Sequence, residues 1–311
     1  TEEALLALEQ AILLRKTLQP SAQPLDHTLA LAELNQRWTQ IKHDASLVQG
    51  RLPSEAEAIL WERLDRVETL LEQVASNPDQ GNLEVRRLDA LADLATRRGR
   101  IAYSAKEQRL DEAFAFWNEA DKLYQRSSQT ASDLNQRYNE RNRGLLQFTW
   151  ASGLRNANRL GEALTQSEAY ISLCRVLLQQ QNTPTAQRDL TKGLILGYLT
   201  RRSLSKTEDQ PSEIIKLQGE SQLLLEEATE ISERLHSGDP EDVRSLELWA
   251  EAHYNLALLQ FDRKDYPSAG EITADLVAHV QTEHARGVQN QRSVAILKAA
   301  RDLQRICADR E

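Results

Sequence analysis

The chain is poor in several residue types, and each shortage argues against a class of protein. Aromatic residues make up 5% of the 311 positions, and valine, isoleucine and tyrosine are too sparse to build a large sheet. No stretch approaches the roughly 20 consecutive apolar residues that a membrane helix needs. Methionine is absent, for which we find no physical reason. We therefore expect neither a sheet protein nor a protein that spans a membrane.

Cysteine is almost as scarce, with two residues in the whole chain. Cys174 and Cys307 lie far apart in apolar helical contexts, and neither belongs to a CxxC or CxxxH pattern, so we interpret both as buried thiols. Such usage suits a reducing compartment, and we predict a cytoplasmic location. No signal peptide is visible and residue 1 is Thr, so we expect the chain to be a piece of a longer polypeptide.

Positive charge is in deficit, because 47 acidic residues outnumber 38 lysines and arginines and leave a net charge of −9. A general nucleic-acid binder carries the opposite sign. Local arginine clusters occur at 97–100, 137–143 and 201–202, and glutamates interrupt or flank them. We interpret these clusters as members of ion pairs within the chain, and we expect no nucleic-acid partner.

Leu, Ala, Glu, Gln and Arg dominate the composition, and all are strong helix formers. Apolar residues recur every three or four positions over residues 1–18, 26–49 and 53–77, with Asp26 placed to cap the second segment. Prolines and glycines fall between the segments, where they end helices. We predict an all-α protein in which residues 1–78 form an N-terminal three-helix unit.

The pattern then changes to pairs of helices separated by short polar turns, at 108–113, 158–163, 205–212 and 264–269. Small residues mark the start of each second helix: Ala113, Ala163, Ala269 and, less clearly, Gly219. They are spaced by 50, 56 and 50 residues, which is typical of stacked helical repeats. We predict helix-pair repeats over residues 79–285 and a capping helix over residues 286–311.

The segment 250–276 resembles a tetratricopeptide repeat, which combines a large residue, a Leu-small pair, an aromatic, a polar-aromatic turn and an alanine. The matching residues here are His253, Leu256, Ala257, Phe261, Asp265, Tyr266 and Ala269. The resemblance extends over residues 82–280, although the spacing is near 50 rather than about 34 residues. It implies a right-handed α-solenoid of antiparallel helix pairs.

The same resemblance implies a protein or peptide partner on the concave face, which the first helix of each pair lines. It assigns that face to Phe148, Arg155, Asn156, Tyr198, Arg201, Arg202, Tyr254 and Phe261. The alternative is that half of these residues only pack between repeats. By analogy with similar arrays, we expect an interaction module of a larger bacterial signalling or regulatory protein. The competing hypothesis is a structural element that assembles with copies of itself, and the sequence leaves the oligomeric state open.

Catalytic patterns are weak throughout the chain. Ser203 and Lys206 match an SxxK string, but no further hydrolase motif follows it. His279 and Glu283 have the i,i+4 spacing of two metal ligands on one helix. HExxH is absent and no third ligand can be named, so we interpret this pair as part of a solvated polar face and His253 as a core histidine. We expect no enzyme activity, no cofactor and no bound metal.

Overall fold

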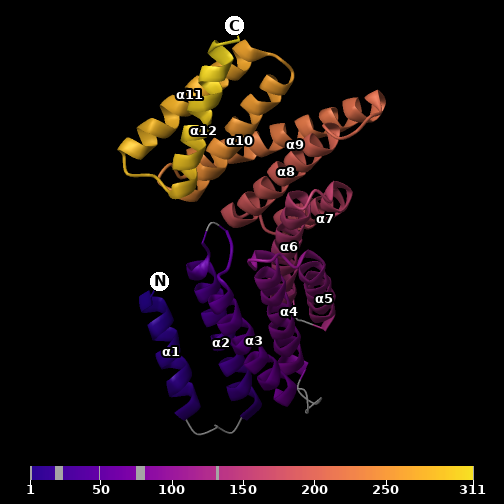
Figure 1. The fold of residues 1–311 in the computed structure, drawn as a ribbon, viewed down its shortest axis with the longest axis vertical. Coiled ribbons are helices and arrows are strands. Elements are labelled where there is room, and N and C mark those ends of the chain that lie inside the picture. The colour runs from indigo at the N-terminus through magenta and orange to yellow at the C-terminus, as the bar shows by residue number, and fades with distance from the viewer. Residues whose placement is uncertain (1, 18–23, 49, 75–80, 131–132, 311) are drawn as a thin grey trace. The chain divides into compact units, whose positions relative to one another are not determined.

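A computed structural model describes residues 2–17, 24–48, 50–74, 81–130 and 133–310 (Figure 1). These residues form twelve helices and no strand, which confirms the all-α prediction. None of the helices in these ranges is long and apolar enough to cross a membrane. The first six are α1 (Glu2–Thr17), α2 (Pro24–Ser46), α3 (Ser54–Val74), α4 (Gly81–Ser104), α5 (Leu110–Thr130) and α6 (Asp133–Asn156). The others are α7 (Leu160–Gln180), α8 (Pro184–Ser205), α9 (Pro211–Gly238), α10 (Val243–Asp262), α11 (Tyr266–Ala285) and α12 (Gln291–Ala308).

Helix boundaries follow the punctuation of the sequence closely. The four predicted turns coincide with the breaks between α4 and α5, α6 and α7, α8 and α9, and α10 and α11. Proline stands in the first turn of α8, α9 and α11, where its missing N–H costs no hydrogen bond. One boundary differs: α2 begins at Pro24, so Asp26 lies in its first turn instead of capping it.

Packing runs mainly between sequence neighbours, as in a helical solenoid. In addition α2 contacts α4, and α10 contacts α8 and α12. The chain divides into two compact units, Thr1–Gly153 and Leu154–Glu311, and α6 contributes residues to both.

The core of the first unit does not stop at the predicted boundary of residue 78. One buried cluster combines Leu64 and Leu71 of α3 with Leu94 and Ile101 of α4. The three N-terminal helices therefore share their core with the first predicted repeat, because α3 and α2 both present apolar side chains to α4.

Small residues lie where helices approach most closely. Ala113, Ala163 and Ala269 are fully buried, as expected for residues between packed helices. Gly219 is exposed, and no atom lies within 4 Å of where its Cβ would be, so its prediction as a fourth marker was wrong. The buried positions near it on α9 are Leu217 and Ser221.

Candidate functional site

Two of the predicted groove residues are inside the second unit rather than on a face. Tyr198 of α8 is fully buried, and its hydroxyl donates to the carbonyl of Asn255, 3.2 Å away. Arg201 is also buried, and its guanidinium donates to Glu168 at 2.6 Å and Glu220 at 3.1 Å. Predicting them as exposed lining residues was wrong, because that turn of α8 is enclosed by neighbouring helices.

The other predicted residues of α8 and α10 are partly buried and engaged within the unit. Arg202 donates to both carboxylate oxygens of Asp262, one of them at 3.1 Å. Tyr254 and Phe261 pack on a core cluster that includes Ala257 and Ala269. This part of the predicted groove therefore holds α8, α10 and α11 together.

The three predicted residues of α6 differ in exposure. Phe148, in the first unit, and Arg155, in the second, are half-buried, whereas Asn156 is exposed at the end of the helix. All three interact with other residues of the chain. The structure therefore gathers the predicted residues of α8 and α10 into one packed region of the second unit.

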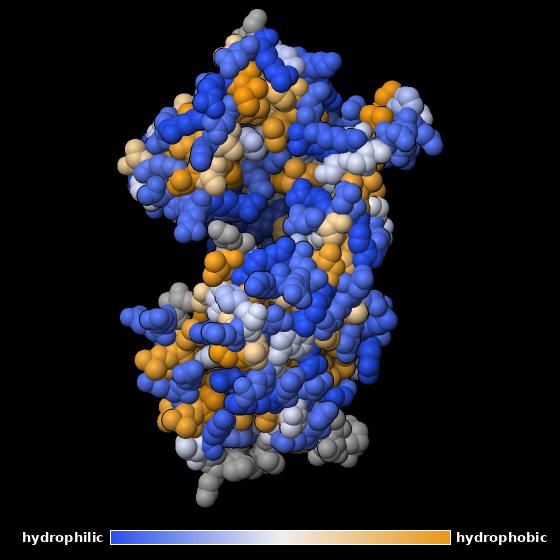
Figure 2. Space-filling model, viewed as in Figure 1, coloured by the Kyte–Doolittle hydropathy of each residue, from blue (hydrophilic) through white to orange (hydrophobic). Residues whose placement is uncertain are grey.

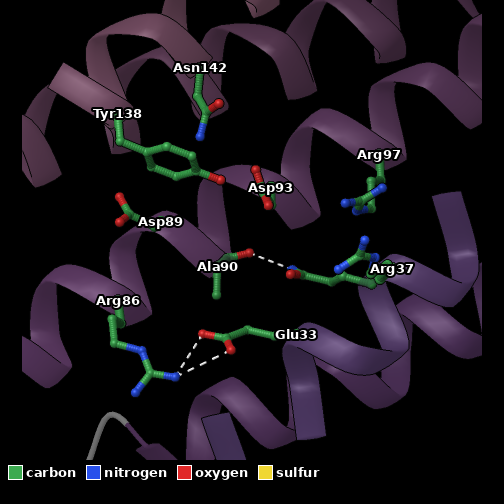
Figure 3. A pocket seen from close by; sticks show the side chains of 10 residues that line it. Glu33, Arg37, Arg86, Asp89, Ala90, Asp93, Arg97, Tyr138 and Asn142 are labelled. Atoms are coloured by element: carbon green, nitrogen blue, oxygen red, sulfur yellow. Dashed lines mark hydrogen bonds and ion pairs between the residues drawn. The ribbon is translucent and has the colours of Figure 1, made fainter. Parts of the chain in front are cut away.

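A different feature, a pocket in the first unit, has the character of a binding site. Its volume is about 470 Å³, and α2, α4 and α6 contribute its walls (Figure 3). Its lining is polar and charged, with three acidic and three basic side chains. The lining residues are Glu33, Gln36, Arg37, Arg86, Asp89, Ala90, Asp93, Arg97, Tyr138 and Asn142.

Helical periodicity places these side chains together. On α4, positions 86, 89, 90, 93 and 97 recur every three or four residues and so share one face of the helix. The same spacing relates positions 33, 36 and 37 of α2 and positions 138 and 142 of α6. Three polar stripes thus meet around one hollow, and neighbouring faces of α2 and α4 carry the apolar core.

Several of the charges are already neutralised by neighbours. Arg86 donates to Glu33 at 3.0 Å (Figure 3), and it also pairs with Asp26. The Arg97 guanidinium donates to the side-chain oxygen of Gln40 at 2.7 Å, while its Nε is buried without a hydrogen-bond partner.

The two aspartates of α4 form the acidic side of the pocket. Asp93 accepts a hydrogen bond from the buried hydroxyl of Tyr124, and Asp89 accepts one from Ser127 at 2.5 Å. Burial, with a contribution from the negative charge of Asp93, raises the pKa of Asp89 from its ordinary 3.8 to about 6. The pocket therefore holds carboxylates that a bound cation would stabilise.

Two further side chains of the pocket face solvent. Tyr138 is 60% exposed on α6, and Figure 3 shows its ring directed into the hollow toward Asp93. Arg37 is exposed, and no hydrogen bond or ion pair joins it to the described part of the chain. A smaller cavity of about 120 Å³ shares Asp93, Arg97 and Asn142 with the pocket and continues it along α4 and α6. An aromatic ring and an exposed cation beside a carboxylate pair can anchor a peptide side chain.

The sequence interpretation missed this pocket entirely. Its one signal was the polar stripe on each predicted helix, but a solvent-exposed helix face has the same pattern. Nothing in the spacing indicates which stripes face one another, so the site depends on how the helices pack.

The arginine clusters are largely paired within the chain, as predicted. Arg98 donates to Asp65 and Glu68 of α3, and Arg143 donates to Asp121 of α5 at 2.7 Å. Their partners lie on other helices and are not the flanking glutamates. No family model matches the chain, and the search of curated proteins found no similar sequence.

Proposed function

We propose that this chain is a protein-interaction module that binds a peptide segment of a partner in the pocket between α2, α4 and α6. The observation that carries the proposal is the pocket itself, with an exposed tyrosine, an exposed arginine and two adjacent carboxylates in its walls. Aromatic and arginine side chains in concave sites are typical anchors of protein recognition.

The chemistry of the pocket specifies the ligand further. A lysine or arginine side chain of the peptide pairs with Asp89 and Asp93, and the ring of Tyr138 covers its aliphatic part. Arg37 is positioned for an acidic side chain or a terminal carboxylate of the same peptide. The net charge of −9 favours the approach of a basic partner.

A tetratricopeptide-like solenoid is part of the proposal. Within each unit, alternate helices contact one another, α2 with α4 in the first and α10 with α8 and α12 in the second, which supports an inner layer of alternate helices in each unit. The pocket lies between α2, α4 and α6, which belong to that layer. We assign no reaction to the chain, and we keep the cytoplasm as its location because both cysteines are buried thiols.

The test is a selection of peptides from a random display library against the whole chain, followed by calorimetry with the enriched sequences. We expect the binders to share a lysine or arginine. Tyr138→Ala and Asp93→Asn should each weaken binding about tenfold or more, as for the loss of an anchor worth ~1.4 kcal/mol or more. Glu72→Gln, an exposed carboxylate of α3 outside the pocket, is the matched control and should leave affinity unchanged.

The binding should also depend on pH, because Asp89 has a pKa of about 6. A cation binds the ionised carboxylate, so affinity for a basic peptide should fall as the pH is lowered from 7 to 5. Binders that tolerate both pocket substitutions, or a library that enriches nothing above background, would refute the pocket as the docking site.

A second function, self-assembly, has one observation in its favour. Leu6, Leu13 and Leu14 of α1 are 57–65% exposed, although the buried side of that helix also packs on the core. Figure 2 shows this apolar surface over α1, at the lower left of the view. A helix that is apolar on more than one side is typical of a buried position. For this face we infer a second copy of the chain as the partner.

A further inference from the structure

Two histidines and a glutamate converge in the second unit, well apart from the peptide pocket in sequence. His236 comes from the last turns of α9, and His279 and Glu283 come from successive turns of α11 (Figure 1). One ligand atom from each side chain lies within 4.8 Å of the others. His236 of α9 thus supplies the third candidate ligand that the i,i+4 pair of His279 and Glu283 lacked in the sequence.

The cluster is buried, which corrects its interpretation as a solvated polar face. His236 is 6% exposed and Glu283 is 4% exposed, and only His279 is half-exposed. A carboxylate in such a place needs compensation, because burying an unpaired charge is costly. Among the described residues, Glu283 pairs with Arg286, whose guanidinium donates to Oε1 at 3.0 Å. The Arg286 side chain is 65% exposed.

The rings are held in position by an aromatic neighbour. The ring of Trp249, from α10, lies 4.3 Å from that of His279 and 5.9 Å from that of His236, between centroids. The ring of Trp249 also packs against that of His253, with 4.1 Å between centroids. The Nδ1 atom of His253 forms a hydrogen bond with the backbone carbonyl of Trp249. Trp249 of α10 therefore contacts both imidazoles of the cluster and helps to orient them.

The hydrogen bond between the histidines does not explain this arrangement. Their Nε2 atoms lie 2.8 Å apart, so in a metal-free protein one ring donates to the other. This hydrogen bond engages only the two imidazoles, and among the described residues no hydrogen bond joins either ring to the carboxylate of Glu283.

We propose that His236, His279 and Glu283 bind a divalent transition-metal ion, with Zn²⁺ as the preferred ion. Two imidazoles and a carboxylate suit zinc, whereas magnesium and calcium prefer oxygen ligands. In a tetrahedral site with Zn–N bonds of about 2.0–2.1 Å, two nitrogens lie roughly 3.3 Å apart. The two Nε2 atoms need to separate by about 0.5 Å, and Glu283 needs to approach by on the order of 1 Å.

The fourth position of the ion would be open to solvent. A cavity of about 680 Å³ borders the cluster, and Glu283 forms part of its wall together with Arg286 and the α9–α10 connection. Three protein ligands and an accessible fourth position are the pattern of zinc sites that bind water or an exchangeable ligand. The site goes beyond peptide binding and shares no residue with the pocket of the first unit.

The test is a zinc titration of the whole chain after chelator treatment, by competition with a chromophoric chelator. We expect one Zn²⁺ per chain, with Co²⁺ binding competitively and Mg²⁺ not at all. X-ray absorption of the zinc complex should show two imidazoles and oxygen ligands and no sulfur, which separates this site from Cys174 and Cys307.

Three variants make the result decisive. His279→Ala should weaken zinc binding by more than the 10- to 100-fold that loss of an outer-shell partner causes. Glu283→Gln keeps the side-chain shape and should also weaken binding, which guards against an effect of unfolding. His27→Ala, on α2 of the first unit, is the control and should bind as the unaltered chain does. Absence of saturable binding by the unaltered chain, or zinc affinity in both the His279→Ala and Glu283→Gln variants equal to that of the unaltered chain, would overturn the proposal.

Discussion

At the scale of single residues, the absence of a side chain determines how closely α4 and α5 pack. Gly99 of α4 faces Trp117 of α5, whose ring is fully buried and donates from Nε1 to the carbonyl of Thr96 at 3.3 Å. A Cβ on residue 99 would overlap the indole and would lie 3.0 Å from the carbonyl oxygen of Ala113. The large ring and the missing side chain are therefore complementary.

We predict that Gly99→Ala destabilises the chain by about 1–3 kcal/mol, since the indole is enclosed and has no free space to move into. Gly219→Ala is the matched control, because it also lies inside a helix but has open space around it. There alanine should stabilise by about 0.5–1 kcal/mol through its better helix propensity. Urea unfolding followed by circular dichroism measures both, and equal effects of the two changes would contradict this packing argument.

Asp89 makes the stability of the first unit depend on pH. Its pKa is about 6 in the folded chain and its ordinary value is 3.8, so the folded state holds the proton more tightly. Between pH 4 and 6 the unfolded chain therefore loses this proton first, and the contribution of Asp89 to stability falls as the pH rises. Above about pH 7 Asp89 is ionised in both states, and its contribution no longer changes with pH.

Asp89→Asn removes this titration while keeping an oxygen that accepts from Ser127. We expect the unaltered chain to lose stability relative to Asp89→Asn as the pH rises from 4 to 7, and the difference to stay constant from 7 to 8. Urea midpoints measured across this range are the test. A difference that does not change with pH would show that the carboxyl is not perturbed.

At the scale of elements, one residue both caps helix α10 and joins it to a neighbouring helix. Asp242 accepts hydrogen bonds from the backbone N–H groups of Arg244 and Ser245 and from the hydroxyl of Ser245. It also pairs with Arg188 of α8 at 2.8 Å. The cap thus starts α10 and joins it to α8 in one interaction, and α10 carries the tryptophan beside the histidine cluster.

We predict that Asp242→Ala costs about 1–2 kcal/mol, since it removes the cap and leaves Arg188 unpaired. Asp242→Asn retains a capping oxygen and loses only the charge, so it should cost clearly less. Thermal or urea unfolding of the two variants gives the comparison. If the asparagine variant were as destabilised as the alanine variant, the ion pair and not the cap would be the main contribution.

At the scale of the whole molecule, the exposed leucines of α1 bear on whether copies of the chain associate. Its leucines lie at the surface of the first unit, and a negative net charge of −9 opposes close association of copies. Apolar burial and charge repulsion therefore act in opposite directions, and salt, which screens the repulsion, favours association.

We predict that light scattering at physiological salt shows a mass that increases with protein concentration. Replacing Leu6, Leu13 and Leu14 together by Gln should keep the chain monomeric, because these side chains supply the exposed apolar area of α1. Ile215→Gln with Leu223→Gln, which changes equally exposed residues of α9, is the control and should not alter the mass. A monomer at every concentration in the unaltered chain would exclude self-assembly.

The helices could be predicted from the sequence alone, because their starts and ends depend on local chemistry. Prolines at 184 and 211, the polar turns and the apolar spacing specify where each helix lies, and the buried alanines 113, 163 and 269 follow from the same pattern. A hydrophobic stripe records that one side of a helix is buried, and this needs no knowledge of its neighbour.

The roles of the polar side chains, in contrast, depend on how the helices pack against one another. Tyr198 and Arg201 were predicted to line a groove, but both are buried. Asp89 and Asp93 have the spacing of a solvent-exposed helix face, but they line a pocket. His279 and Glu283 form a three-residue cluster only with His236, which precedes them by 43 and 47 residues and lies on another helix. Periodicity gives the direction of a side chain relative to its own helix, but a site requires the side chains of several helices to meet, and that depends on packing over long sequence distances.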